Sequence, residues 1–355
     1  MLLPQLLRRG TGALTLAAAF FACEGAPISP SSPDTRVPAL PVAEPREAPP
    51  VTFTRYPNPV HPGDFADPFV LVADSSYYAY ATNRGSVNVP MLHSSDLVSW
   101  TPAGDAMPSL PEWAESGKRL TWAPAVIEVA GRFLLFYTAR DWRSGLQCIG
   151  RAESRIPTGP FVDENRGPFI CQMDLGGSID ASPVRDESDE VYIIWKNDGN
   201  CCAKPVTFWS QRLDSTGREL VGPRSAILHR DQAWEGPLIE APTMWQENGG
   251  WHLLYSANVW NTERYATGYA ACASPMGPCT KAGHGPVLAS NAETAGPGGA
   301  EVFTDRRGSH WVAYHGWTAG LVGYRNGGAR SLRLDRISLT PGQLLTSSTS
   351  LSQSQ

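Results

Sequence analysis

Residues 123–139, APAVIEVAGRFLLFYTA, contain a short apolar strand, an Ala-Gly turn and a second strand rich in aromatic residues. This hairpin pattern returns in four other segments, at residues 67–82, 182–197, 241–258 and 300–317. Four units carry a proline near their start, at positions 68, 124, 183 and 242, and Glu301 takes the fifth place, so the units follow one another at 56, 59, 59 and 59 residues. Self-similarity at a nearly fixed period predicts a repeat architecture.

The length of the repeat predicts which architecture this is. Each unit has two clear strands and room for two more, which matches one four-stranded propeller blade. Turn residues such as Asn248-Gly249-Gly250 and Arg307-Gly308 lie where hairpins need them. We therefore predict an all-β chain folded as a five-bladed β-propeller. A β-sandwich with chance similarity is the alternative, and the constant spacing argues against it.

The composition is that of a turn-rich globular protein with a sizeable core, with 42% hydrophobic and 18% charged residues, 34 Gly and 31 Pro. The formal net charge of −5 provides no basic surface for a polyanion, and the sequence has no Lys/Arg cluster. These features exclude nucleic acid as a partner and favour a neutral or weakly charged ligand.

Residues 1–23 are typical of an export signal. Arg8 and Arg9 precede an apolar run, residues 13–22, that is shorter than the ~20 residues needed to cross a membrane. The run ends at Cys23 in a context that resembles a bacterial lipobox, so either the signal is cleaved nearby or Cys23 is lipidated and tethers the protein to a membrane. We expect an exported monomer that is secreted, periplasmic or lipid-anchored at the cell surface.

Three further segments follow the predicted signal. Residues 24–50 hold eight prolines among Ser, Glu and Ala, a composition that cannot form a core and predicts an extended linker. The propeller is expected to span residues 51–345, and residues 346–355 to form a disordered tail.

Six cysteines follow Cys23, an even number in a chain predicted to be exported, which favours disulfides. The pair Cys272–Cys279 would close a short loop, and Cys148–Cys171 is the next pair expected. The adjacent residues Cys201–Cys202 either form a vicinal bridge or stay reduced. The spacing lacks the paired Cys or His ligands of a zinc site.

Three carboxylates share one register of the repeat. The innermost strand of each blade lines the central channel, so residues at one register converge on one pocket. Counted back from the repeat proline, Asp67 lies one residue before it, Asp180 three residues and Glu240 two. The second unit has Trp122 and Ala123 at this register. We predict that three acids, an indole and small residues face one cavity.

Carboxyl groups crowded into one pocket repel one another, which raises the pKa of at least one of them. Glycoside hydrolysis needs this division, because one carboxylic acid protonates the leaving oxygen while an ionised carboxylate activates water or attacks the sugar. The sequence therefore predicts a glycosidase with Asp67, Asp180 and Glu240 as its catalytic carboxylates, and with Trp122 stacked on the apolar face of a sugar ring.

Other residues compete for the same roles. Glu235 also precedes a small residue and a proline and is the main rival for the acid, but Glu240 keeps the repeat register. His315 follows the inner strand of the fifth unit and is either a core residue or a residue near the pocket. Four aspartates are assigned to turns: Asp64, Asp74, Asp186 and Asp305.

The motifs that carry these residues are Phe65-Ala66-Asp67-Pro68, Trp122-Ala123-Pro124, Ser178-Ile179-Asp180-Ala181-Ser182-Pro183, Ile239-Glu240-Ala241-Pro242 and Tyr314-His315. Together they resemble glycoside hydrolase family 43 from residue 51 to about residue 340. The resemblance implies that Asp67 is the general base, Glu240 the general acid, and Asp180 the residue that raises the pKa of the acid and orients it. It also implies single-step inversion, which requires acid and base carboxyls ~6.5–9.5 Å apart.

The resemblance also concerns metal binding and substrate contacts. Many family members carry a His after the Gly-Pro-Gly of the fifth blade, linked to a calcium or water site on the axis, but here Gly296-Pro297-Gly298 is followed by Gly299. We therefore expect no required cofactor and no metal ligand among the site residues, with a structural calcium as the alternative. His315 would take part of the missing role and, with Trp122 and Ala123, contact the substrate.

The resemblance implies an oligosaccharide or polysaccharide substrate: arabinan, arabinoxylan or xylo-oligosaccharides, with α-L-arabinofuranosidic linkages preferred over β-D-xylosidic ones. Fructose-cleaving furanosidases share the five blades, but their Asn-Asp-Pro-Asn opening is replaced here by Ala66-Asp67-Pro68-Phe69. A noncatalytic glycan-binding propeller is the alternative from a different class of protein, and the three intact carboxylates argue against it.

Overall fold

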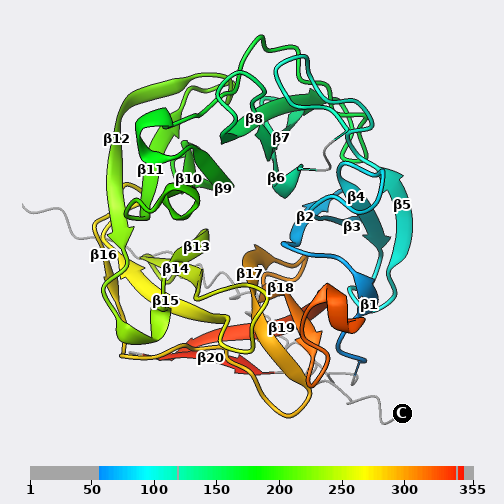
Figure 1. Ribbon diagram of the computed structural model, residues 1–355, viewed down its shortest axis with the longest axis vertical. Helices are drawn as coiled ribbons and strands as arrows, with labels where there is room; N and C mark the ends of the chain where they lie inside the picture. Colours follow the sequence, from blue (N-terminus) through cyan, green and yellow to red (C-terminus); the bar gives the residue numbers. More distant parts are fainter. Residues whose placement is uncertain (1–55, 118–119, 341–342, 348–355) are drawn as a thin grey trace, which may run out of the picture. The chain divides into compact units, whose positions relative to one another are not determined.

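The repeated hairpins form five antiparallel sheets that are arranged in a ring (Figure 1). The computed structural model describes residues 56–117, 120–340 and 343–347. In these ranges helix is confined to short 3-10 turns, namely η1 (Met173–Leu175), η2 (Gly199–Cys202), η3 (Ala233–Glu235) and η4 (Tyr324–Asn326). The prediction of an all-β five-bladed propeller is confirmed.

Each of the first four sheets is built from consecutive strands. The first is β2 (Phe69–Ala73), β3 (Ser76–Tyr80), β4 (Pro90–Ser94) and β5 (Thr101–Asp105), and the second is β6 (Trp122–Val129), β7 (Arg132–Arg140) and β8 (Gln147–Ser154). The third is β9 (Ser178–Arg185), β10 (Val191–Asn197), β11 (Thr207–Leu213) and β12 (Leu220–His229), and the fourth is β13 (Ile239–Glu247), β14 (Gly250–Ala257), β15 (Ala266–Cys272) and β16 (Cys279–Lys281).

The second sheet differs from the predicted four strands, because the structure gives it three. The outer edge of β8 is instead met by isolated bridges from Val162 and Ile170. The chain between β8 and β9 therefore follows this edge without forming a continuous fourth strand.

The fifth sheet combines both ends of the described chain. Its strands are β17 (Thr294–Thr304), β18 (His310–Thr318), β19 (Ser331–Thr340) and β1 (His61–Asp64), with β20 (Gln343–Ser347) also paired to β19 (Figure 1). The pairing of β1 with β19 closes the ring. The five inner strands, β2, β6, β9, β13 and β17, contact one another in turn around the axis.

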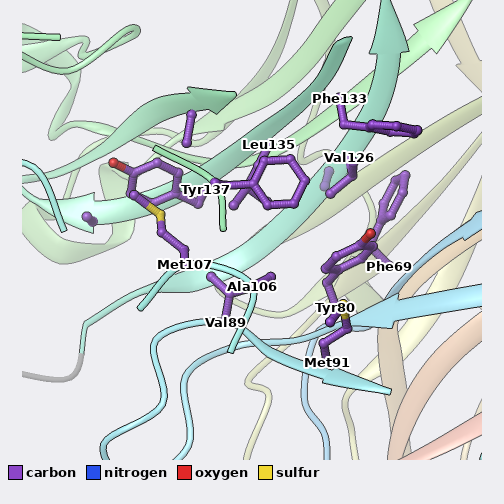
Figure 2. Close-up of a cluster of buried hydrophobic side chains, with 14 of the residues drawn as sticks. Phe69, Tyr80, Val89, Met91, Ala106, Met107, Val126, Phe133, Leu135 and Tyr137 are labelled. Carbon is purple, nitrogen blue, oxygen red and sulfur yellow. The ribbon is translucent and has the colours of Figure 1, made fainter. Parts of the chain in front are cut away.

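Apolar side chains fill the spaces between neighbouring blades. Figure 2 shows one such cluster, in which Phe69 and Tyr80 of the first blade meet Phe133, Leu135 and Tyr137 of the second. Burying a side chain of this size stabilises the fold by about 1.5–3 kcal/mol. Because the strands alternate their side chains between two faces, each blade packs against both of its neighbours.

The described part of the chain contains three disulfides, Cys148–Cys171, Cys201–Cys202 and Cys272–Cys279. The two pairs favoured by the sequence are confirmed, and the structure chooses the vicinal bridge over reduced thiols for the third. Among the described residues, no helix combines the length and apolarity that spanning a membrane requires.

The described residues cover only some of the segment boundaries that the sequence predicts. The export signal with Cys23 and the linker at residues 24–50 lie outside the described residues. Strand β20 continues to Ser347, two residues beyond the end predicted for the propeller.

Candidate active site

One residue with a left-handed backbone conformation lies close to the start of the inner strand in the first four blades, and in the middle of β17 in the fifth. Its φ angle is 50° at Asp67, 42° at Ala123, 57° at Asp180, 49° at Ala241 and 57° at Gly299. Four of these residues, Ala123, Asp180, Ala241 and Gly299, lie within the register shifts of β-bulges, which redirect side chains and are frequent next to active sites. The shared register predicted from the sequence therefore corresponds to a shared backbone bend.

These bends surround a small cavity on the propeller axis. Its volume is about 30 Å³, and all five blades line it, with Asp67, Ala123, Asp180, Ala241 and Gly299 among the lining residues. A volume of ~10–15 Å³ is enough for a water molecule. The predicted convergence of Asp67 and Asp180 on one cavity is thus present, and Glu240 directly precedes the lining residue Ala241.

Asp67 is held by groups from three parts of the chain. Thr82 Oγ1 donates to Asp67 Oδ2 at 2.6 Å, and the Arg330 guanidinium lies 3.4 Å from both carboxylate oxygens. Burial raises the pKa of Asp67, but Arg330 and the Thr82 hydrogen bond outweigh burial, so the pKa lies below its usual value. Asp67 is therefore ionised at neutral pH, as a general base must be.

Glu240 lies at the start of β13 and is largely buried. Lys196 Nζ donates to Glu240 Oε2 at 3.1 Å, and the Tyr265 hydroxyl donates to Oε1 at 2.8 Å. Both oxygens of the carboxyl thus have a fixed partner, which holds its plane in one orientation.

Asp180 acts on the strand that carries Glu240. Asp180 Oδ2 accepts a 2.9 Å hydrogen bond from the backbone N–H of Ala241, the bulge residue that follows Glu240. Burial raises the pKa of Asp180 to about 7, and the nearby Glu240 and Asp67 also raise it, against the opposing charge of Lys196. The Asp180 carboxyl is therefore partly protonated near neutral pH. Its hydrogen bond to Ala241 fixes the backbone bend there.

Lys196 is a fully buried cation of the site, with no exposed surface on its side chain. Burial lowers its pKa, but Glu240, Asp180 and Asp198 outweigh this, so Lys196 stays charged. Asn200 Oδ1 accepts a second hydrogen bond from Nζ at 2.9 Å. One positive charge thus faces several carboxyls, and burial raises the pKa of Asp198 to about 6.

His315 lies behind Asp67 and is completely buried. Its Nδ1 accepts the backbone N–H of Asp67 at 3.1 Å, and its ring stacks on Tyr265 with 5.7 Å between ring centroids. Burial and Arg330 lower the pKa of His315 to about 3, so the ring is neutral. The structure brings His315 to the site through Asp67, and its predicted contact with substrate stays a prediction.

The two other predicted substrate residues lie at the start of β6. Ala123 lines the axial cavity, and its backbone N–H donates to Thr82 Oγ1 at 3.0 Å. Trp122 is half-buried beside it and pairs with Thr138 of β7. Stacking of Trp122 on a sugar remains a prediction.

The rival residues have structural partners elsewhere. Glu235 is fully buried, accepts the backbone N–H groups of Asp231 and Gln232, and bonds the Tyr255 hydroxyl and Lys281. Asp64 accepts the backbone N–H of Arg330 at 3.0 Å. The remaining three acids directly follow the inner strands, in hairpin turns as predicted: Asp74, Asp186 and Asp305.

The predictions from the sequence did not include the residues that bind the carboxyl groups of Asp67 and Glu240. Lys196 ends the apolar run VYIIWK, so a lysine in an otherwise buried strand was a visible signal. Arg330 and Tyr265 stand outside the five repeated segments, and Thr82 is the last residue of the first one. Within the described residues, no group of three or more His, Cys, Asp or Glu side chains is placed to hold a metal ion, and the calcium site stays a prediction.

Comparison with known proteins gives a family-model match, described as glycosyl hydrolases family 43, over residues 56–344. The β-D-galactofuranosidase xynD of Aspergillus niger is 25% identical over 281 residues, which cover 74% of this chain and 76% of that protein. The extracellular endo-α-(1->5)-L-arabinanase 1 of Bacillus subtilis is 26% identical and covers 66% and 76%.

Solved structures show the same architecture. A thermostable family-43 glycoside hydrolase superposes with a TM-score of 0.72 at 30% identity, covering 82% of this chain and 95% of that one. An endo-1,4-β-xylanase from Bacteroides thetaiotaomicron superposes with a TM-score of 0.68 at 26% identity, covering 81% and 95%.

Proposed function

The chain belongs to glycosyl hydrolase family 43, and from this premise we propose that it hydrolyses arabinose- or xylose-containing plant polysaccharide with Asp67 as base and Glu240 as acid. The observation that carries the proposal is one axial cavity lined by Asp67 and Asp180, with Glu240 next to it and each carboxyl held by named partners. The arabinanase and the galactofuranosidase among the relatives support an α-L-arabinofuranosidic substrate over a β-D-xylosidic one.

The roles follow from the charges around each group. Asp67, kept ionised by Arg330, takes a proton from the attacking water. Glu240 protonates the leaving oxygen, and Tyr265 and Lys196 hold its carboxyl in place. Asp180 orients Glu240 through the bulge at Ala241.

The cleavage would proceed in one displacement. Water activated by Asp67 attacks the anomeric carbon while Glu240 protonates the departing oxygen from the other side, which inverts the anomeric configuration. The water is consumed, one glycosidic C–O bond breaks, and the proton taken by Asp67 balances the proton given by Glu240.

We also propose that the protein acts outside the cytoplasm. Residues 1–23 have the composition of an export signal, the described residues include three disulfides, and the arabinanase relative is named extracellular. Fractionation of cells that express the full chain, with a Cys23→Ala variant to detect lipid anchoring, tests this placement. Recovery of the protein in the cytoplasm with residues 1–23 intact would contradict it.

Hydrolysis assays test the activity. The purified protein is incubated with p-nitrophenyl α-L-arabinofuranoside, p-nitrophenyl β-D-xyloside and debranched arabinan, alongside Glu240→Gln as the control. We expect release from the arabinosides that is lost in the variant, with a product of inverted anomeric configuration by early-time NMR. Sugar binding without turnover of any substrate would instead identify a noncatalytic propeller, and a retained anomer would contradict the assigned mechanism.

A further inference from the structure

Glu301 occupies the place in the fifth blade that the other blades give to proline, and its carboxyl lies in the axial channel. It lines the small cavity beside Asp67 and Asp180, and it also lines a second cavity of about 520 Å³ formed mainly by hairpin ends of the blades. Glu301 therefore stands between the candidate active site and the other end of the channel.

The Glu301 carboxyl joins two other blades by hydrogen bonds. Ser182 Oγ of β9 lies 3.2 and 3.3 Å from its two oxygens, and Thr243 Oγ1 of β13 donates to Oε1 at 2.8 Å. Thr243 Oγ1 also accepts the backbone N–H of Val302 at 3.2 Å, which fixes the direction of its own proton toward Glu301. One side chain of β17 thus connects β9 with β13.

These two strands are the ones that carry the acid and the residue that orients it. Ser182 follows Asp180 by two residues, and Thr243 follows Glu240 by three, just beyond the bulge at Ala241. A shift of either strand along the axis would move one carboxyl relative to the other, and a displacement near 1 Å can cost about 10²-fold in rate.

We propose that Glu301 is a positioning residue, whose carboxyl links β9 and β13 across the axis and holds Asp180 and Glu240 in register. The inference rests on the proposed roles of these two residues. It goes beyond them by assigning a purpose to a carboxyl that takes no part in the chemistry.

The surroundings of Glu301 favour an uncharged carboxyl. In the described part of the chain, its hydrogen-bond partners are two hydroxyl groups, and no cation forms an ion pair with it. Burial raises the pKa of Glu301 to about 8 against the two hydrogen bonds, which lower it. Both hydroxyls donate to the Glu301 carboxyl, and a glutamine at this position can keep a bond to each, because its amide oxygen accepts from Thr243 and its amide nitrogen can donate to Ser182 Oγ.

The experiment compares Glu301→Gln with Glu301→Leu, which keeps the bulk and removes both hydrogen bonds. We expect Glu301→Gln to keep kcat within about threefold, and Glu301→Leu to lower kcat by roughly 10- to 100-fold with a smaller change in KM. The control is Glu187→Leu, an exposed glutamate that lines the same wide cavity, and it should leave kcat unchanged. Wild-type kcat in Glu301→Leu would overturn the proposal.

A second measurement needs no substrate. Carboxyl carbon NMR of protein labelled at aspartate follows the titration of Asp180, assigned with Asp180→Asn. The titration midpoint should move in Glu301→Leu and stay in Glu301→Gln, and an unmoved midpoint in both would overturn the proposal even if the wild type cleaves none of the test sugars. If Glu301→Leu does not fold, Ser182→Ala and Thr243→Val each remove one bond, and unchanged kcat and titration in both would count equally against it.

Discussion

At the scale of single residues, charge is distributed by neighbours from distant parts of the chain. Arg330 lowers the pKa of Asp67 from 263 positions away, and Lys196 reaches Glu240 from the preceding blade. Asp67, which lines the axial cavity, and Glu240, which lies next to it, therefore have different partners, an arginine in one case and a lysine with a tyrosine in the other. This asymmetry supports the different roles proposed for the two carboxyls.

Removal of either reacting carboxyl should abolish most of the activity. We expect Asp67→Asn and Glu240→Gln each to lower kcat by at least ~10², because general acid and base groups contribute this much, while the folded state is kept. Steady-state kinetics with circular dichroism checks both parts. Glu235→Gln is the comparison, and loss of activity there with an active Glu240→Gln would transfer the acid role to Glu235.

Gly299 sets how closely the fifth blade approaches Asp67, the proposed base. A Cβ at this position would lie 2.5 Å from His315 Nδ1 and 2.9 Å from Asp67 Oδ1, at a φ of 57°. We expect Gly299→Ala to displace Asp67 and lower kcat by roughly 10- to 100-fold. Gly308→Ala is the matched control, because its φ of 80° is also left-handed but its Cβ meets open space. Equal kinetics in the two variants would show that the contact with Asp67 is unimportant.

At the scale of the elements, the inner strands and their bulges place the carboxyls. Asp tolerates the left-handed region better than most residues, which suits it to the bends at Asp67 and Asp180. In the fourth blade the bend falls on Ala241 instead, and the carboxyl of Asp180 accepts its N–H. A carboxyl of the third blade thus completes the bend of the fourth, which couples the two strands.

Asp180 should make the stability of the fold depend on pH. Its pKa is about 7 in the folded protein, above the ~3.9 of an unfolded chain, so between these values the folded state binds the extra proton. Stability should therefore fall as the pH rises from about 4 to 7, since the unfolded state binds fewer protons there. Thermal unfolding of Asp180→Asn from pH 4 to 8 should show a smaller fall in Tm than the wild type. An equal fall would contradict the raised pKa.

At the scale of the whole molecule, the ring depends on the closure between its two chain ends. Asn58 is buried beside β19, where its amide donates to Leu334 O at 3.0 Å and to Asp335 Oδ1 at 3.1 Å and accepts from Leu334 N–H. Tyr56 also donates to Leu334 O, at 2.7 Å. These bonds and the β1–β19 pairing attach the first described residues to the last blade.

Loss of this attachment should destabilise the fold without changing the chemistry. Asn58→Ala leaves buried polar groups unpaired, at about 1–3 kcal/mol for each, which would lower Tm by several degrees. The kcat of the folded variant should match the wild type, because Asn58 contacts none of the site residues named above. Scanning calorimetry beside Asn261→Ala, an exposed asparagine, checks the effect, and equal Tm values would show that the closure does not depend on Asn58.

The sequence by itself determined the blade count and the register of the acids. Both follow from local patterns, because each hairpin has its own alternation of apolar and polar side chains and its own turn residues. Five copies follow one another at a nearly constant spacing. Each copy has the same backbone bend, which comes just before Phe69, Ala125, Ser182, Pro242 and Ala300. The tertiary structure alone decided which cation faces which carboxyl, that His315 supports Asp67 from behind, and that Glu301 joins β9 to β13. Those pairings join residues of different blades, and their strength depends on distance and burial, which no local pattern contains.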